Sequence, residues 1–227
     1  MALWAYDTNS HRYRVTQEGA RELGRRAGTY IGERQMVAVR DQWVTAAKAR
    51  TDALASQYAR GTINLQQWQA GMRQEIRVNF VNEYMLGRGG RNNMTPSDWG
   101  RIGQRVQVQY RYLESFAAEI STGRLSDAQI AARARMYVEA SSQAYERGNA
   151  AARGAPDLPH YPGDGSTQCR SNCKCHWRIT ETETEWRCYW QISPVENCGD
   201  CLTRAGQWNP LVIAKQPAQT REVERAR

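Results

Sequence analysis

The sequence predicts a mainly α-helical protein, built as a helical bundle or an array of helical hairpins, with a small C-terminal β-hairpin domain of the zinc-knuckle type. Three observations predict this fold class. Helix-start signals recur ahead of segments whose apolar residues have helical spacing. A segment rich in proline and glycine then ends the helical pattern. All six cysteines follow that segment, between positions 169 and 201.

The first sixty residues are expected to hold an N-terminal arm and one long helix. Residues 1–30 form the arm, whose structure stays open: residues 6–15 fit a short strand or an extended arm, and residues 17–26 have a helical composition. Residues 31–153 form the helical domain. Its first helix is predicted over residues 31–60. The apolar residues that recur along this helix are Met36, Val39, Trp43, Ala47 and Leu54.

A second helix is predicted to begin after Asn64. The Asn64 side chain can cap the helix, and Gln67 can reach back to it as in a capping box. Ile63 and Trp68 take the two positions of a hydrophobic staple. Gly87 and the Gly-Gly pair after it are expected to stop the helix. Its predicted apolar face holds Leu65, Trp68, Met72, Ile76, Phe80 and Tyr84.

The third predicted helix starts in the same way. Thr95 is the cap, Pro96 takes the first helical position, and Asp98 stands three residues after the cap. Gly123 closes this helix. Its predicted apolar face holds Trp99, Ile102, Val106, Tyr110, Leu113, Ala117 and Ile120.

A fourth helix is predicted after Ser126. Ser126 and Gln129 repeat the capping arrangement, with Leu125 and Ile130 as the staple. This helix is expected to continue as a single element to about Gly148. Three capped helices and one longer helix before them indicate a helical bundle or hairpin array.

Residues 154–213 are predicted to form the Cys-rich domain, and residues 214–227 a polar tail. The domain begins in the Pro- and Gly-rich segment, which cannot continue a helix. Beyond it the apolar period changes to two, and two such runs joined by a polar turn predict a β-hairpin. The inward-facing residues of this hairpin are expected to be Cys175, Trp177, Ile179, Trp186, Cys188, Trp190 and Ile192.

The cysteine spacing predicts a zinc site. Cys198 and Cys201 have the Cys-x2-Cys spacing of a metal knuckle, and Gly199 permits the turn that points both sulfur atoms at one ion. A tetrahedral zinc ion needs two further ligands, which the cysteines before the hairpin can supply. Five cysteines are candidates for the four ligand positions: Cys169, Cys173, Cys175, Cys198 and Cys201. We favour Cys169, Cys173, Cys198 and Cys201 as the four ligands.

The expected role of this Zn²⁺ is structural. Four thiolates fill the coordination sphere, whereas catalytic zinc keeps an open position. A domain with one hairpin buries too little surface to fold alone, so a metal would supply the missing stability. His160 and His176 are weaker candidate ligands, and Cys188 is expected to lie in the core. No metalloprotease, deaminase or nucleophile motif is found in the sequence, which predicts that the chain is not an enzyme and has no small-molecule substrate.

The charge and the apolar pattern limit the partners and the compartment that we expect for this chain. The formal net charge is +8, and the surplus lies in the first 150 residues. Such a surface favours nucleic acid or an acidic partner, or is simply a solvated helix surface. No segment approaches the roughly 18 apolar residues of a membrane-spanning helix, and the start has no secretory signal. The expected compartment is therefore the reducing cytoplasm of a cell or an infected host, where clustered cysteines are more often metal ligands than disulfides.

Several motifs resemble one known family. Residues 161–167 read Tyr-Pro-Gly-Asp-Gly-Ser-Thr, and residues 172–175 read Asn-Cys-Lys-Cys. With Cys169, Trp177 and the Cys-Gly-Asp-Cys element at 198–201, they resemble the C-terminal segment of phage minor head (head morphogenesis) proteins, the group similar to the Mu F protein. The order of the two cysteine elements is reversed relative to better-known members, in which a histidine stands near the position of Cys169.

The resemblance covers about residues 60–213 and implies a low-copy structural component of a phage or prophage head. It implies that the protein contacts the portal or major capsid proteins and assists head assembly or genome delivery, with possible contact to packaged DNA. The implied location is the virion, in the head interior or portal region, after assembly in the host cytoplasm. From the residues alone, the alternative is a nucleic-acid-binding or regulatory zinc-knuckle protein.

Overall fold

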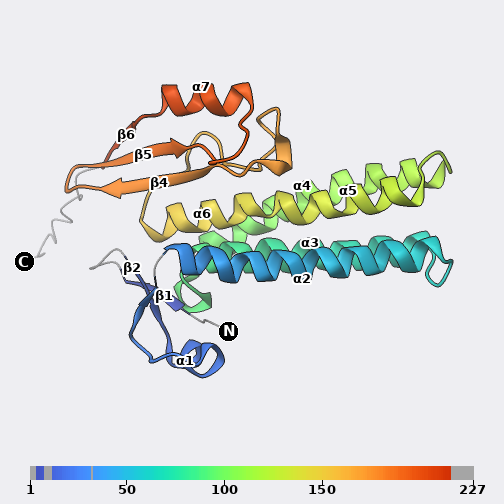
Figure 1. Ribbon diagram of the computed structural model, residues 1–227, viewed down its shortest axis with the longest axis horizontal. Helices are drawn as coiled ribbons and strands as arrows, with labels where there is room; N and C mark the ends of the chain where they lie inside the picture. The colour runs from blue at the N-terminus through green and yellow to red at the C-terminus, as the bar shows by residue number, and fades with distance from the viewer. Residues whose placement is uncertain (1–3, 8–11, 32, 216–227) are drawn as a thin grey trace, which may run out of the picture. The chain divides into compact units, whose positions relative to one another are not determined.

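The computed structural model describes residues 4–7, 12–31 and 33–215, and it is mainly helical, as the sequence predicts. A small three-stranded antiparallel sheet lies near the C-terminus (Figure 1). Internal contacts divide the chain after Lys174 into two units, and each is described by itself. The boundary that we placed in the Pro- and Gly-rich segment stays a prediction.

The N-terminal arm contains three short strands and a helix. The strands pair antiparallel in the order β1-β2-β3, and Val15 of β2 is buried. Thr16 caps α1, since its hydroxyl accepts a hydrogen bond from the Gly19 N–H at 3.0 Å. The bounds are β1 Trp4–Asp7, β2 Arg12–Val15, α1 Gln17–Leu23 and β3 Tyr30–Ile31.

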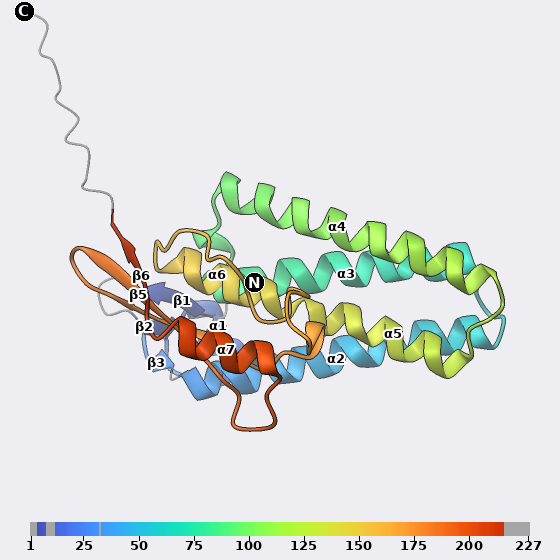
Figure 2. The same ribbon diagram turned by 90° about the horizontal axis from the view of Figure 1, so that it is seen from above.

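The helical part of the first unit is a set of long helices that run alongside one another (Figures 1 and 2). Helix α3 packs on α2, α4 and α6, while α5 packs on α2. The helices are α2 Glu33–Ala59, α3 Leu65–Gly87, α4 Pro96–Ser121, α5 Asp127–Ala140 and α6 Ser142–Ala152, with a short 3-10 turn, η1, at Arg91–Asn93.

The predicted helix starts are confirmed. Capping boxes join Asn64 to Gln67 before α3, Thr95 to Asp98 before α4, and Ser126 to Gln129 before α5. The predicted apolar faces of α3 and α4 form most of the core. Its fully buried members include Trp68, Met72, Ile76, Phe80, Tyr84, Leu113 and Phe116.

Two predictions about these helices are wrong, and a third concerns side chains that the structure does not describe. Trp99 is 40% exposed and does not belong to the buried face of α4, because it lies in the first helical turn, beyond the core. The predicted single helix from Ser126 to Gly148 is two helices, broken at Ser141. The Ser141 hydroxyl donates to the Val138 carbonyl at 2.6 Å, a local bond that competes with helical pairing. The side chains of residues 31–39 lie outside the description.

Helices α3 and α6 approach each other through two glycines. A Cβ atom on Gly87 would lie 2.1 Å from the Tyr145 carbonyl oxygen, and one on Gly148 would lie 2.2 Å from the Tyr84 carbonyl oxygen. Because both neighbours are backbone atoms, neither can move aside as a flexible side chain would. The contact therefore requires glycine at both positions.

A buried carboxylate links α3 to the start of α4. Asp98 is 2% exposed and accepts hydrogen bonds from the Tyr84 hydroxyl at 2.6 Å, from the Thr95 N–H at 2.8 Å and from Arg88 Nε at 3.2 Å. Burial by itself would raise the pKa of Asp98, but the bonds from Tyr84, Thr95 and Arg88 outweigh it and lower that pKa. Asp98 is thus held in its charged form.

Replacing Asp98 with asparagine is expected to lower the free energy of unfolding at pH 7 by about 2 kcal/mol, since hydrogen bonds to a charged group are lost. The pKa of Asp98 is lower in the folded protein than in the unfolded chain, where it is about 3.9. The charged carboxylate therefore stabilises the fold at pH values above about 3.9, and this stabilisation is lost as the pH falls through the pKa of the folded state. The difference between wild type and Asp98→Asn should therefore shrink at pH 3. Urea unfolding at both pH values measures it, with Asp127→Asn, exposed in the first turn of α5, as the control. An equal difference at both pH values would contradict the role of the charge.

After α6 the chain runs through an irregular segment that a local network holds in place. Asp164 accepts hydrogen bonds from the Tyr161 N–H and the Ser166 N–H, both at 2.9 Å, and the Tyr161 hydroxyl accepts one from the Leu158 N–H at 3.0 Å. Gly163 has a φ of +81°, and a Cβ there would meet the Ser142 hydroxyl at 2.4 Å. The Tyr-Pro-Gly-Asp-Gly-Ser motif is thus explained by the turn that it forms against α6.

The second unit is a three-stranded antiparallel sheet with one helix. The predicted hairpin is confirmed: Trp177 pairs with Trp190 and Ile179 with Cys188, and β6 adds a third strand beside β5. The sequence analysis missed β6 and α7. Their bounds are β4 His176–Glu181, β5 Glu185–Gln191, α7 Gly199–Gln207 and β6 Leu211–Ala214. Among the described helices of both units, none is long and apolar enough to cross a membrane.

Candidate metal centre

Cys169 and Cys173 flank a single 3-10 turn, η2, at Arg170–Asn172, which packs against α5. The Asn172 N–H donates to the Cys169 carbonyl at 2.9 Å, and Arg170 takes a φ of +48°, unusual for a residue with a side chain. The tight turn brings the thiol groups of Cys169 and Cys173 close to each other. Cys173 is 4% exposed, and the Cys169 Sγ lies 3.3 Å from the Thr167 hydroxyl.

Cys198 and Cys201 lie at the start of α7. Cys198 is the N-cap and Cys201, 1% exposed, is in the first helical turn. This corrects the sequence-based interpretation of Gly199, which begins the helix and takes none of the positive φ values found at other glycines. A helix N-terminus favours negative charge and hence the thiolate form that binds metal.

Cys175 and Cys188 have other surroundings. The Cys175 thiol is buried and donates a weak bond to the Asn197 side-chain oxygen at 3.7 Å, and that oxygen also accepts from the Ser193 N–H at 3.1 Å. Cys188 is fully buried within β5, which agrees with the prediction of a core residue. The sequence analysis did not find the role of Asn197. Its position directly before Cys198, in a polar segment after a strand, is the signal that points to a turn-forming side chain.

The candidate ligands are divided between the two units. Cys169 and Cys173 belong to the first unit, where their thiol groups lie within 4.8 Å of each other, so this pair can supply two ligands of a metal ion. Thiolates at the usual zinc–sulfur distance of 2.3 Å in a tetrahedral site are about 3.8 Å apart, which is within this limit. Soft thiolate ligands select zinc, copper(I) or iron–sulfur clusters over calcium and magnesium. Cys175, Cys198 and Cys201 belong to the second unit.

Three of the four tryptophans in the second unit form a cluster. Trp177 meets Trp190 edge to face at 5.2 Å between ring centroids and stacks on Trp208 at 5.4 Å, with Arg204 over the Trp190 ring. Trp186 instead lies beneath the Lys215 ammonium group. The cluster gives this small sheet an aromatic core of its own.

Comparison with known proteins finds no matching family model, no matching curated protein and no matching solved structure.

Proposed function

We propose that this chain is a non-enzymatic structural protein of the head of a tailed phage or prophage, and that its cysteine cluster holds a structural zinc ion. The observation that carries the proposal is the close pair of thiols at Cys169 and Cys173, since these cysteines, with the Cys-x2-Cys element at 198–201, belong to the motifs that resemble phage minor head proteins. The expected partners are the portal and major capsid proteins, and the expected location is the head interior or portal region.

Cys198 is the fourth ligand that we favour. It is three residues before Cys201 at the start of the same helix, which is the Cys-x2-Cys spacing of a metal knuckle. With four thiolates the metal would have no open position for a reacting water, so its role would be to stabilise the fold.

The first test is metal content. Purified protein is expected to contain about one zinc ion per chain, measured by inductively coupled plasma mass spectrometry after dialysis against metal-free buffer. Protein that is fully folded without metal, with the cluster thiols paired as disulfides, would refute the zinc site.

The second test is location. Mass spectrometry of purified virions or procapsids from the host of this gene is expected to detect the chain at low copy number. Absence of the chain from both particles would exclude its proposed role as a head protein, whatever metal the purified chain contains. Portal and terminase genes beside the coding sequence would support it.

The net charge of +8 favours the alternative, a nucleic-acid-binding zinc protein. Many arginines are already paired with carboxylates, however, such as Arg40 with Glu83 at 2.6 Å and Arg135 with Asp52 at 2.6 Å. These pairs reduce the charge that is available to phosphates. A gel shift at low and high salt separates the two functions, because phosphate contacts weaken steeply as salt rises.

A further inference from the structure

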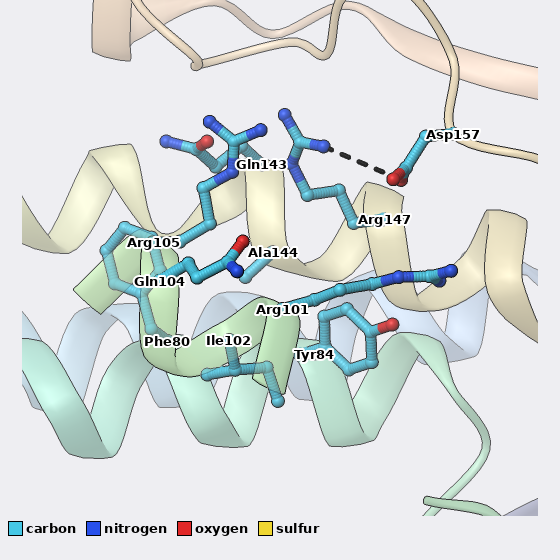
Figure 3. A pocket seen from close by; sticks show the side chains of 10 residues that line it. All are labelled: Phe80, Tyr84, Arg101, Ile102, Gln104, Arg105, Gln143, Ala144, Arg147 and Asp157. Carbon is cyan, nitrogen blue, oxygen red and sulfur yellow. Dashed lines mark ion pairs between the residues drawn. The ribbon is translucent and has the colours of Figure 1, made fainter. Parts of the chain in front are cut away.

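A pocket in the first unit gathers arginines from two helices. It lies between α3, α4 and α6, under the segment that follows α6 (Figure 3). Its volume is about 60 Å³, several times the roughly 10–15 Å³ that one water molecule requires. Its polar lining consists of Tyr84, Arg101, Gln104, Arg105, Gln143, Arg147 and Asp157.

The charges of this lining do not balance. Three guanidinium groups and one carboxylate, that of Asp157, line the pocket. Two carboxylates outside the lining also attract these arginines, Asp98 acting on Arg101 and Asp164 on Arg147. Asp157 lies 3.8 Å from an Arg147 terminal nitrogen, and its own side chain is 61% exposed, so this pair is weak. Among the ion pairs of the described residues none includes Arg105.

Arg147 is the least exposed of the three, since the side chains of Arg101 and Arg105 are exposed. Its side chain is only 13% exposed and stacks on the Tyr161 ring at 4.0 Å, and its buried Nε has no hydrogen-bond partner in the described structure. Burial lowers the pKa of Arg147, and the nearby charge of Arg105 lowers it further. Figure 3 shows the guanidinium groups of Arg105 and Arg147 on the same side of the pocket. The Arg105 side chain is itself exposed to solvent, so an anion that bound here would be attracted by both positive charges and could accept from the unpaired Arg147 donor.

We propose that this pocket binds a small tetrahedral oxyanion of the phosphate class. Guanidinium groups present planar, paired donors that match phosphate oxygens, and the side-chain amides of Gln104 and Gln143 add further donors. The small volume fits the anion itself better than a whole nucleotide. The site is independent of the cysteine cluster and of the proposed head function.

Titration calorimetry and thermal unfolding with inorganic phosphate test the site at constant ionic strength, with sodium chloride as the reference salt. Wild type is expected to unfold at a higher temperature in phosphate than in chloride. Binding to Arg105→Gln and Arg147→Gln should be weaker by at least about tenfold, because each variant loses charged hydrogen bonds. Arg111→Gln, an exposed arginine on the same helix, is the control and should bind as wild type does.

The stability without phosphate separates lost binding from lost folding. In chloride alone, Arg105→Gln is expected to be at least as stable as wild type, because its repulsion with Arg147 is gone. Equal unfolding temperatures of wild type in phosphate and chloride, or unchanged phosphate binding in Arg105→Gln, would overturn the proposal. A comparison with dimethyl phosphate, a singly charged diester, identifies the kind of phosphate that the pocket binds. Tighter binding of inorganic phosphate than of dimethyl phosphate indicates a free phosphate or a monoester. Equal binding of the two indicates a phosphodiester.

Discussion

Replacing Gly87 with alanine is expected to lower the free energy of unfolding of the helical unit by at least about 3 kcal/mol, and Gly148→Ala should do the same. The added Cβ would lie 2.1 Å from the Tyr145 carbonyl oxygen in the first case and 2.2 Å from the Tyr84 carbonyl oxygen in the second. Carbon and oxygen atoms need more than 3 Å, so α3 and α6 must separate along their whole contact. A loss of this size lowers the melting temperature of such a unit by about 10 °C.

Gly103 provides the matched control. It lies inside α4, is exposed, and has no atom within 4 Å of a built Cβ. Gly103→Ala should be neutral or raise the stability by up to about 1 kcal/mol, because alanine has the higher helix propensity. Circular dichroism during urea and thermal unfolding measures all three variants. If Gly87→Ala were as stable as Gly103→Ala, the close approach of the two helices would be wrong.

Replacing Cys201 with serine is expected to release the proposed zinc ion and to unfold the C-terminal sheet. Cys201 is 1% exposed in the first turn of α7 and is one of the four proposed ligands, so its loss removes a buried thiolate from the metal. Binding free energies of structural zinc in small domains are about 10–16 kcal/mol, larger than the stability of most small domains. The measurements are the zinc content and the near-ultraviolet circular dichroism of the tryptophan cluster.

Cys188→Ala is the control for this prediction. Cys188 is equally buried but lies in β5 and is not a proposed ligand, so the variant should keep the proposed zinc ion while losing some packing. Full zinc content in Cys201→Ser would contradict its role as a ligand. Loss of zinc from both variants alike would show that the metal leaves because the sheet unfolds, and would likewise contradict a specific role of Cys201.

The sequence predicted those elements that local interactions determine. The starts of α3 and α4 were predicted to the residue, because a capping box involves only four consecutive residues and is visible in the sequence. The break at Ser141 was missed, since a serine inside a helical pattern is ordinary until its hydroxyl is seen on the Val138 carbonyl. Helix α7 was missed because Gly199 favoured a turn. The apolar run of β6, Leu211–Ala214, is a strand signal that the sequence does contain.

The two sites differ in how far the sequence could predict them. The cysteines occur within 33 residues of one another, so spacing alone indicated a metal site, although spacing could not select which four of the five candidate thiols bind the metal. The arginine pocket was not predictable in this way. Arg101 and Arg105 are one helical turn apart, but Arg147 reaches them only through the packing of α6 near α4. Sites of this kind depend on tertiary contacts, which a single sequence does not reveal.

The pairing of α3 with α6 also constrains how this chain can fold during synthesis. The glycines that meet there are about 60 residues apart, and ribosomes add about 5–20 residues per second. For several seconds α3 has therefore left the ribosome while its partner does not yet exist, and part of its apolar surface is open to other chains. A nascent chain that is stalled or truncated before Ser142 would expose this surface permanently, so such fragments should be the forms that aggregate or recruit chaperones.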